Sequence, residues 1–281
     1  WTVTAGALPA GLALDANSGE IAGTPTTVET QAFTVQVADS FGHLATQALS
    51  ITVDAGAAAR LAITQSPDTA VAGSLLAPAL MVHVVDASGN AVADSGVSVT
   101  VALLDGTGPL LGTLVRGTDA AGIATFDDLV LEAAGKARRL VVTAAGLDSA
   151  ASASFDVTPA SPASIAFVQQ PTPVLVGAPL TPPVTVRVAD AYSNGVAGEN
   201  VTLALSGAGV LGGTTAAATD SLGVATFAGL TIDTPGAGKV LEATAGPLGP
   251  VASDSFDVGC PAIALAPDSL PHGLDGTPYA Q

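Results

Sequence analysis

Hydrophobic and polar residues alternate in short runs along much of this chain. The runs 97–103, 184–188 and 201–205 each place Val or Leu at every second position, with small or polar residues between them. A period of two puts one row of side chains inward and the other outward, as in a half-buried antiparallel sheet. Glycine and asparagine pairs such as Asn194-Gly195 fall between the runs and predict tight turns. Seven or so short strands per roughly 100 residues predict a two-layer β-sandwich.

The central part of the chain repeats itself. Residues 61–65 match residues 165–169 at an offset of 104, and residues 122–126 match 223–227 at an offset of 101. Such self-similarity indicates two homologous modules, which we place at 56–159 and 160–258. The Ala-rich stretch 55–62 has neither a helical period nor helix caps, and we interpret it as linker. Proline in the short junctions near residues 159 and 261 favours an elongated array with limited bending.

The two ends of the chain follow a different pattern. Residues 8–25 read LPAGLALDANSGEIAGTP, and FTVQVAD follows at 33–39. This closely resembles the putative-Ig, cadherin-like modules of bacterial surface proteins. Residues 260–281 resemble the opening strand of the same family. We therefore expect a partial module at 1–55 that lacks its first strands, and the opening strands of a further module at 259–281. The N-terminus has no Met and no signal peptide, and we expect the chain to be part of something longer.

The central modules resemble the immunoglobulin-like repeats of the invasin and intimin group. The resemblance lies in the Asp-containing turn at 85–90 and in the G-x-A-T-F strands that begin at Gly122 and Gly223. It implies tandem immunoglobulin-like β-sandwiches that form a rod and present or space something. The resemblance implies no chemistry.

The composition restricts the classes of partner that this chain is expected to bind. The 281 residues contain 48% hydrophobic residues and only 7 basic against 24 acidic ones, a net charge of −17. This charge disfavours binding to nucleic acid and to anionic membranes, because both are bound through clustered Lys and Arg. The mean hydropathy is high, at +0.55, but no run approaches the roughly 20 apolar residues of a spanning helix. With a single cysteine, Cys260, the chain cannot form an internal disulfide. We expect a secreted, extracellular or cell-surface protein without membrane insertion in this segment.

The residues typical of catalysis do not gather in this sequence. The histidines His43, His83 and His272 fall in three different modules, and no nucleophile elbow or zinc-ligand spacing occurs. Asp127 and Asp128 are adjacent on one predicted strand, so we expect them to point to opposite faces. The G-x-G-x-x-G match at 207–212 is not followed by a helical pattern and predicts a loop between strands. We expect no enzyme activity.

Aspartates recur at equivalent places in the two central modules. Calcium at module junctions is one interpretation, because hard cations take oxygen ligands. Strand-ending turns are the favoured one, because Asp bonds to the backbone two residues further on. The calcium candidates are Asp86, Asp119, Asp156, Asp190, Asp220 and Asp257. The sequence Asp15 to Glu20 predicts a hairpin turn, and no other cofactor is expected.

Basic and aromatic residues complete the candidates. Lys136, Arg138 and Arg139 hold three of the seven basic side chains. They suggest either a receptor or polyanion patch or, as we favour, an exposed loop and strand edge with Asp127 and Asp128 as counter-charges. Large aromatics in matching registers are typical of cores. The predicted core aromatics are Trp1, Phe33, Phe126, Phe155, Phe227 and Phe256.

The favoured function is a non-catalytic stalk or spacer in a large bacterial extracellular surface protein, adhesin or fibre. One alternative is a filament subunit in which the C-terminal segment completes the N-terminal module of a neighbour by strand addition. Another is a set of accessory modules of a secreted enzyme. The expected partners are neighbouring Ig-like modules of the same or an identical chain, with a surface receptor or glycan as a further candidate.

Overall fold

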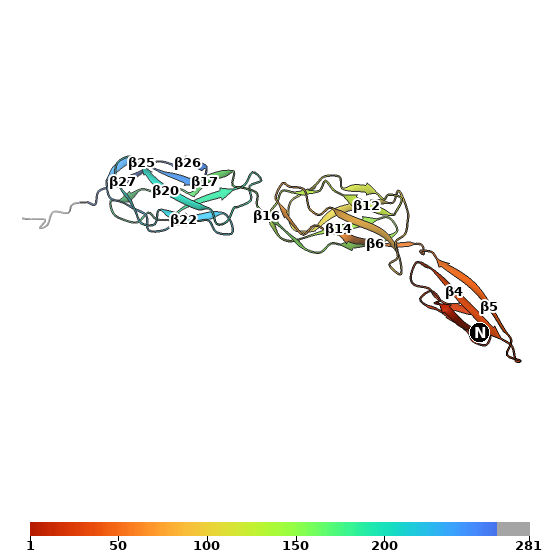
Figure 1. Ribbon diagram of the computed structural model, residues 1–281. Helices are drawn as coiled ribbons and strands as arrows, with labels where there is room; N and C mark the ends of the chain where they lie inside the picture. The colour runs from red at the N-terminus through yellow and green to blue at the C-terminus, as the bar shows by residue number, and fades with distance from the viewer. Residues whose placement is uncertain (263–281) are drawn as a thin grey trace, which may run out of the picture. The chain divides into compact units, whose positions relative to one another are not determined.

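The computed structural model describes residues 1–262, and within that range the regular structure consists of strands. The chain divides into two compact units, one ending at Ala160 and the other beginning at Ser161. Figure 1 shows the strands of each unit stacked in layers. The prediction of an all-β chain of Ig-like modules is confirmed.

The first module (residues 1–55) contains a three-stranded sheet and a short hairpin. Its strands are β1 (Thr2–Gly6), β2 (Leu12–Leu14), β3 (Ile21–Gly23), β4 (Glu29–Ala38) and β5 (Leu44–Val53). The sheet order is β1-β4-β5, and β2 pairs with β3. β4 and β5 pair over ten consecutive positions without a register shift, from Glu29↔Val53 to Ala38↔Leu44. The long regular pairing leaves β5 at one edge of the sheet.

The second module (residues 56–159) is a sandwich of two sheets. Its strands are β6 (Ala58–Gln65), β7 (Thr69–Val71), β8 (Leu80–Asp86), β9 (Ser98–Asp105), β10 (Leu110–Leu111), β11 (Val115–Gly117), β12 (Ile123–Phe126), β13 (Val130–Leu131), β14 (Gly135–Ala144), β15 (Leu147–Ala151) and β16 (Phe155–Thr158). One layer is β6-β8-β12, and the other is β11-β9-β14-β15. A parallel bridge between β15 and β6 joins the two layers at one side.

The third module (residues 160–258) repeats this plan. Its strands are β17 (Ser164–Gln169), β18 (Val174–Leu175), β19 (Val184–Ala189), β20 (Asn200–Ser206), β21 (Leu211–Gly212), β22 (Ala216–Ala218), β23 (Val224–Phe227), β24 (Thr231–Ile232), β25 (Gly236–Ala245), β26 (Leu248–Ala252) and β27 (Phe256–Gly259). One layer is β17-β19-β23, and the other runs β18-β27-β25-β20-β22. Each strand from β17 to β27 therefore has a counterpart from β6 to β16.

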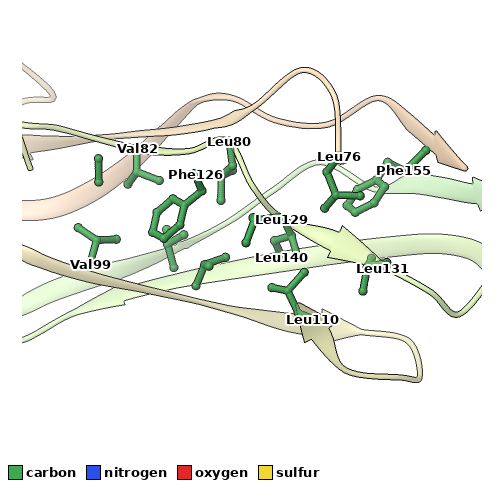
Figure 2. Close-up of a cluster of buried hydrophobic side chains, with 14 of the residues drawn as sticks. Leu76, Leu80, Val82, Val99, Leu110, Phe126, Leu129, Leu131, Leu140 and Phe155 are labelled. Carbon is green, nitrogen blue, oxygen red and sulfur yellow. The ribbon is translucent and has the colours of Figure 1, made fainter. Parts of the chain in front are cut away.

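The inward rows predicted from the period of two form two separate cores. In the second module Leu80 and Val82 of β8 and Phe126 of β12 face Val99 and Leu140 of the opposite layer, as Figure 2 shows. The third module builds the same core from its own strands. The four predicted core aromatics of these modules are at most 3% exposed: Phe126, Phe155, Phe227 and Phe256. Each module thus buries its apolar rows within itself.

Two local predictions were wrong. The stretch 55–62 is linker only in its first residues, because β6 begins at Ala58 and pairs with β8. Alanine in it supplies small side chains to a strand rather than flexibility. Phe33 is buried as predicted, but Trp1 is 41% exposed, because it lies over the Gly19 turn instead of entering a core.

Candidate functional site

Buried polar side chains are the first place to look for a site, and here they recur in pairs. Eight polar or charged residues are buried within the described range, and all eight lie in the two central modules. At the offsets of the sequence repeat they form four equivalent pairs: Asp86 with Asp190, Thr118 with Thr219, Arg138 with Lys239, and Ser152 with Ser253. A buried polar group is costly unless it is hydrogen-bonded. The pairs therefore identify positions that the module itself needs.

The first pair closes a turn. The Asp86 carboxylate accepts the Asn90 backbone N–H at 2.8 Å and the Asn90 amide at 3.0 Å, and its Oδ2 accepts the Gly56 N–H at 3.0 Å. These bonds, with the Asn90 side chain contributing most, lower the pKa of Asp86 to about 2. In the third module Asp190 accepts the Asn194 N–H and amide, both at 2.8 Å.

The cation pair lies inside the modules. Arg138 is 5% exposed and donates to the carbonyl oxygens of Ala133 (3.2 Å) and Ala134 (2.8 Å). A Cβ at Gly106 or Gly135 would collide with its guanidinium, so both glycines make room for it. Lys239 is 6% exposed and donates to the Ala208 carbonyl.

The threonine and serine pairs join backbone segments of their own module through hydrogen bonds of their hydroxyl groups. Thr118 accepts the Val97 N–H at 3.0 Å and donates to the Asp94 carbonyl at 2.6 Å. Thr219 makes the same two kinds of bond to the backbone of the third module. Ser152 accepts the Leu140 N–H at 2.9 Å, and Ser253 accepts the Leu241 N–H at 3.0 Å. All these side chains hold their own module together.

The calcium candidates are spread over separate turns and strands. Asp119 accepts the N–H groups of Ala121 and Ile123, and Asp220 accepts those of Leu222 and Val224. Their four bonds are the Asx-turn contacts that terminate a strand. Within residues 1–262, no three His, Cys, Asp or Glu side chains gather closely enough to hold a metal ion.

Asp156 and Asp257, the remaining pair of calcium candidates, accept hydrogen bonds from the backbone of a β-bulge. Asp156 accepts the Ala137 N–H at 2.9 Å, and Asp257 accepts the Gly238 N–H at 2.8 Å. Ala137 and Gly238 both have a positive φ, 54° and 66°, where β14 and β25 shift register against the final strand of their module. Each carboxylate thus fixes a bulge.

The surroundings of the basic residues at 136–139 were predicted wrongly. Arg138 is buried, and Arg139 lies 3.6 Å from Asp105 rather than near Asp127 or Asp128. The two adjacent aspartates follow β12 instead of lying on it, and both contact Arg116, at 2.8 and 3.1 Å. The expectation that they point to opposite faces fails because the strand has already ended at Phe126.

The other sequence motifs form turns and loops. The G-x-G-x-x-G match runs from the end of β20 into β21 as a loop between strands. Asp15 accepts the N–H groups of Asn17 and Ser18, both at 2.8 Å, in the β2–β3 hairpin turn. His43 contacts Asp39 at 2.7 Å in the exposed β4–β5 turn and lowers the pKa of that carboxyl. His83 lies on β8, and His272 lies outside the described residues.

An open hollow lies on the first module. A hollow of about 590 Å³ is lined by Trp1, Val3, Leu8, Leu12, Leu14 and neighbouring residues. The first seven residues of β5, from Leu44 to Ser50, are exposed. Sequence reasoning missed this edge as a specific surface, although the absence of charged residues and proline from 44–53 could have indicated it.

Fold and polar contacts define an all-β protein of Ig-like modules, two of them closed and self-contained. Residues 1–54 match the family described as Putative Ig domain. A comparison with curated proteins finds no relative of the chain. Among residues 1–262 there is no long apolar helix of the kind that crosses a membrane.

The solved structures that match this chain include proteins of bacteria and animals. Invasin, a bacterial integrin-binding protein, is 18% identical over 69% of this chain and 38% of its own, with a TM-score of 0.32. The Escherichia coli adhesin FdeC is 18% identical over 85% of this chain and 76% of its own (TM-score 0.38). Mouse cadherin-23 repeats EC22–24 are 15% identical over 93% and 86% (TM-score 0.42). With TM-scores below 0.5, these likenesses assign no function.

Proposed function

We propose that this chain is a non-catalytic structural segment, a stalk or spacer, of a bacterial extracellular surface protein such as an adhesin or a fibre. The observation that carries the proposal is the repeated, inward-directed use of polar side chains in the two central modules. The four buried pairs recur at the sequence offset, and their hydrogen bonds serve the backbone of the module. Modules that are complete in themselves can be joined in series without changing each other's cores.

Mechanical unfolding of the full chain tests the spacer. Pulling on the two ends should give a separate event for each central module. Each event should lengthen the chain by somewhat less than about 350 Å, because roughly 100 residues extend by at most about 3.5 Å each and the folded module already spans part of that length. Phe126→Ala should lower the force of one event and leave the other unchanged. A single event that releases both modules together would contradict independent spacer units.

Calcium-dependent stiffening is a subsidiary proposal, motivated by the recurring aspartates. Its test is the melting temperature of the chain in calcium and in excess chelator. A rise with calcium that is lost in Asp86→Asn or Asp190→Asn would support it. Equal melting temperatures in the two buffers would leave these carboxylates with their turn-forming role alone.

Two alternatives concern the context of the modules. Accessory modules of a secreted enzyme would act as the same kind of spacer next to a catalytic domain. The sequence of the complete gene would distinguish them from modules of an adhesin. A filament subunit assembled by strand complementation needs an acceptor surface in residues 1–53. The exposed edge of β5 is the feature that favours this alternative.

A further inference from the structure

Two loops lie where the first module joins the second, and both modules belong to one compact unit. Glu29 at the start of β4 pairs with Val53 at the end of β5, so the β3–β4 loop lies where the chain leaves the first module. Ala58 at the start of β6 pairs with Asp86 at the end of β8. The turn 86–90, which we call the junction turn, therefore lies where the chain enters the second module. The strand registers alone place the two loops at the same connection.

Two hydrogen bonds run from the junction turn to the residues before the second module. The Asn90 side-chain amide donates to the backbone carbonyl of Thr26, in the β3–β4 loop, at 3.2 Å. The Asp86 carboxylate accepts the backbone N–H of Gly56, in the segment between β5 and β6, at 3.0 Å. The same Asn90 amide, which has two N–H donors, also donates to Asp86 at 3.0 Å. One hydrogen-bond network therefore reaches both the linker and the first module.

The second module itself holds these two side chains in place. Asp86 is 5% exposed and accepts the backbone N–H of Asn90 at 2.8 Å, while its own N–H donates to the Asn90 carbonyl at 2.9 Å. The bonds from the Asn90 amide and the Gly56 N–H lower the pKa of Asp86 to about 2, so the carboxylate is charged at neutral pH. A side chain that is already fixed loses little conformational entropy when it binds a neighbour. The junction turn thus offers a preorganised donor and acceptor to the residues before it.

The two bonds attach to different parts of the preceding chain. A bond to Gly56 alone would hold the linker and would let the first module swing about it. The bond to Thr26 reaches a loop of the first module itself, so two separate points are held at once. Rotation of the first module about its linker would break the bond between Asn90 and Thr26. The pair of bonds therefore restrains orientation, which neither bond does alone.

Both groups that the junction turn binds belong to the backbone. The Thr26 carbonyl is present whatever side chain occupies that position, and the Gly56 N–H is lost only to proline. The Thr26 side chain is exposed. The side chains that specify the contact therefore lie in the second module, at Asp86 and Asn90, and not in the first module.

We infer that the junction turn is a docking surface for the module that precedes it in the chain. Asp86 and Asn90 fix the orientation of that module by binding the backbone of the linker and of the β3–β4 loop. The inference rests on the proposed spacer function and deepens it, because it names the residues that stiffen one junction of the array. A spacer with this contact keeps its first two modules in one relative orientation. A spacer without it bends at the linker.

Pulsed electron paramagnetic resonance between two spin labels tests the docking. Gln47→Cys and Thr100→Cys place the labels at exposed positions of β5 and β9, in a chain that also carries Cys260→Ser. We expect one narrow distribution of distances between the labels. Asn90→Ala should broaden it and should lower the ratio of docked to undocked chains by about fivefold, because one neutral hydrogen bond between the modules is lost.

Two control variants isolate the contact between the modules. Thr26→Ala changes the same contact from the other side but keeps the carbonyl, so the distribution should stay narrow. Asn194→Ala removes the equivalent amide bond to Asp190 inside the third module. It should destabilise its module about as much as Asn90→Ala destabilises the second, without broadening the distribution. Broadening in Asn90→Ala alone would therefore report docking rather than a weakened turn.

Substitutions at Gly56 test the second bond without altering the junction turn. The backbone at Gly56 does not have a positive φ, and a Cβ there would lie 3.5 Å from the Asp86 side chain, an ordinary contact. Gly56→Ala keeps the N–H and should leave the distribution narrow. Gly56→Pro removes the N–H and should broaden the distribution, although proline by itself stiffens a linker. An equal or narrower distribution in Gly56→Pro would remove this bond from the account.

Calcium provides a further arm of the same experiment. Direct hydrogen bonds predict the same distribution in calcium and in excess chelator. A distribution that is narrow only in calcium would assign the stiffness to a bound metal and would overturn the inference. So would a broad distribution in the chain that carries only the labels, or equal broadening in Thr26→Ala and Asn90→Ala.

Mechanical unfolding separates this inference from the spacer proposal. The Asn90→Ala chain should still give one event for each central module, because Asn90 lies outside both hydrophobic cores. A broad distribution in the labelled parent chain, with both events retained, would overturn the docking and leave the spacer. A narrow distribution with a single merged event would count against the spacer alone.

Discussion

The first and second modules are built from the same kind of alternating strand, yet they hide very different amounts of apolar surface. Residues 1–54 contain two buried hydrophobic residues, Phe33 and Val35. The core of the second module contains 18, drawn from both of its layers. Alternation therefore makes a sheet with an apolar face, but a second complete layer is needed to cover it. The first module is open where its neighbour is closed.

Core truncation should show this difference most strongly. Phe126→Ala should destabilise the second module by about 3–5 kcal/mol, because it removes a fully enclosed aromatic ring and leaves a cavity. Phe227→Ala should cost the third module about as much. Leu49→Ala should cost less than about 1 kcal/mol, since the side chain is 42% exposed. Urea denaturation monitored for each module checks these values, and equal losses at Phe126 and Leu49 would remove the distinction between closed and open modules.

Removal of the buried Arg138 guanidinium should have the next largest effect on stability. Arg138→Ala should destabilise the second module by about 2–3 kcal/mol, because it leaves the Ala133 and Ala134 carbonyls without their charged donor. Arg116→Ala is the matched control, since its ion pairs with Asp127 and Asp128 are on the surface and are worth at most about 1 kcal/mol. Calorimetry of both variants gives the comparison. A larger loss for Arg116 would contradict a structural role for the buried guanidinium.

A smaller effect should distinguish the two closed modules from each other. Ala137 and Gly238 occupy equivalent bulges with positive φ, a conformation that strains alanine and suits glycine. Ala137→Gly should stabilise the second module, and Gly238→Ala should destabilise the third, each by about 0.5–1 kcal/mol. Thermal melting of the two single variants should shift in opposite directions. Shifts of the same sign would mean that the backbone is not what limits these positions.

The smallest expected effect is an acid dependence of the second module. The folded pKa of Asp86 is about 2, below the ordinary value of 3.8. Between these values the unfolded chain binds more protons, so stability is complete above about pH 4 and falls as the pH drops toward 2. Asp86→Asn should flatten this part of the profile, as followed by the melting temperature from pH 5 to 2. An unchanged slope in the variant would assign the acid dependence to other carboxylates.

Much of the fold could be predicted from the period of two. The run 97–103 became β9, and the run 184–188 lies in β19, with the predicted rows inward. The Asp119 and Asp220 turns also followed from local chemistry, because an Asx turn depends on only a few consecutive residues. These predictions succeeded because the interactions are local or repeated.

The failures involve contacts and strand ends that the alternating pattern does not specify. Arg138 was expected at the surface from its charge, but the carbonyls of Ala133 and Ala134 and the close approach of Gly106 and Gly135 enclose it. Asp127 and Asp128 were assigned to a strand, but β12 ends at Phe126. Arg116 of β11 forms ion pairs with both aspartates. Trp1 looked like a core residue because aromatics usually are, but the open first module offers it no complete core. Neither alternation nor motif spacing reports such tertiary contacts.

Hydrogen–deuterium exchange of the full chain tests most directly whether residues 1–53 form an open module beside two closed ones. In dilute solution, amides of β5 should exchange well before those of β8 and β19, because β5 is an exposed edge strand and the other two lie within closed sandwiches. Protection of β5 equal to that of the central strands in dilute, monomeric chain would show that the first module closes by itself and would contradict the account.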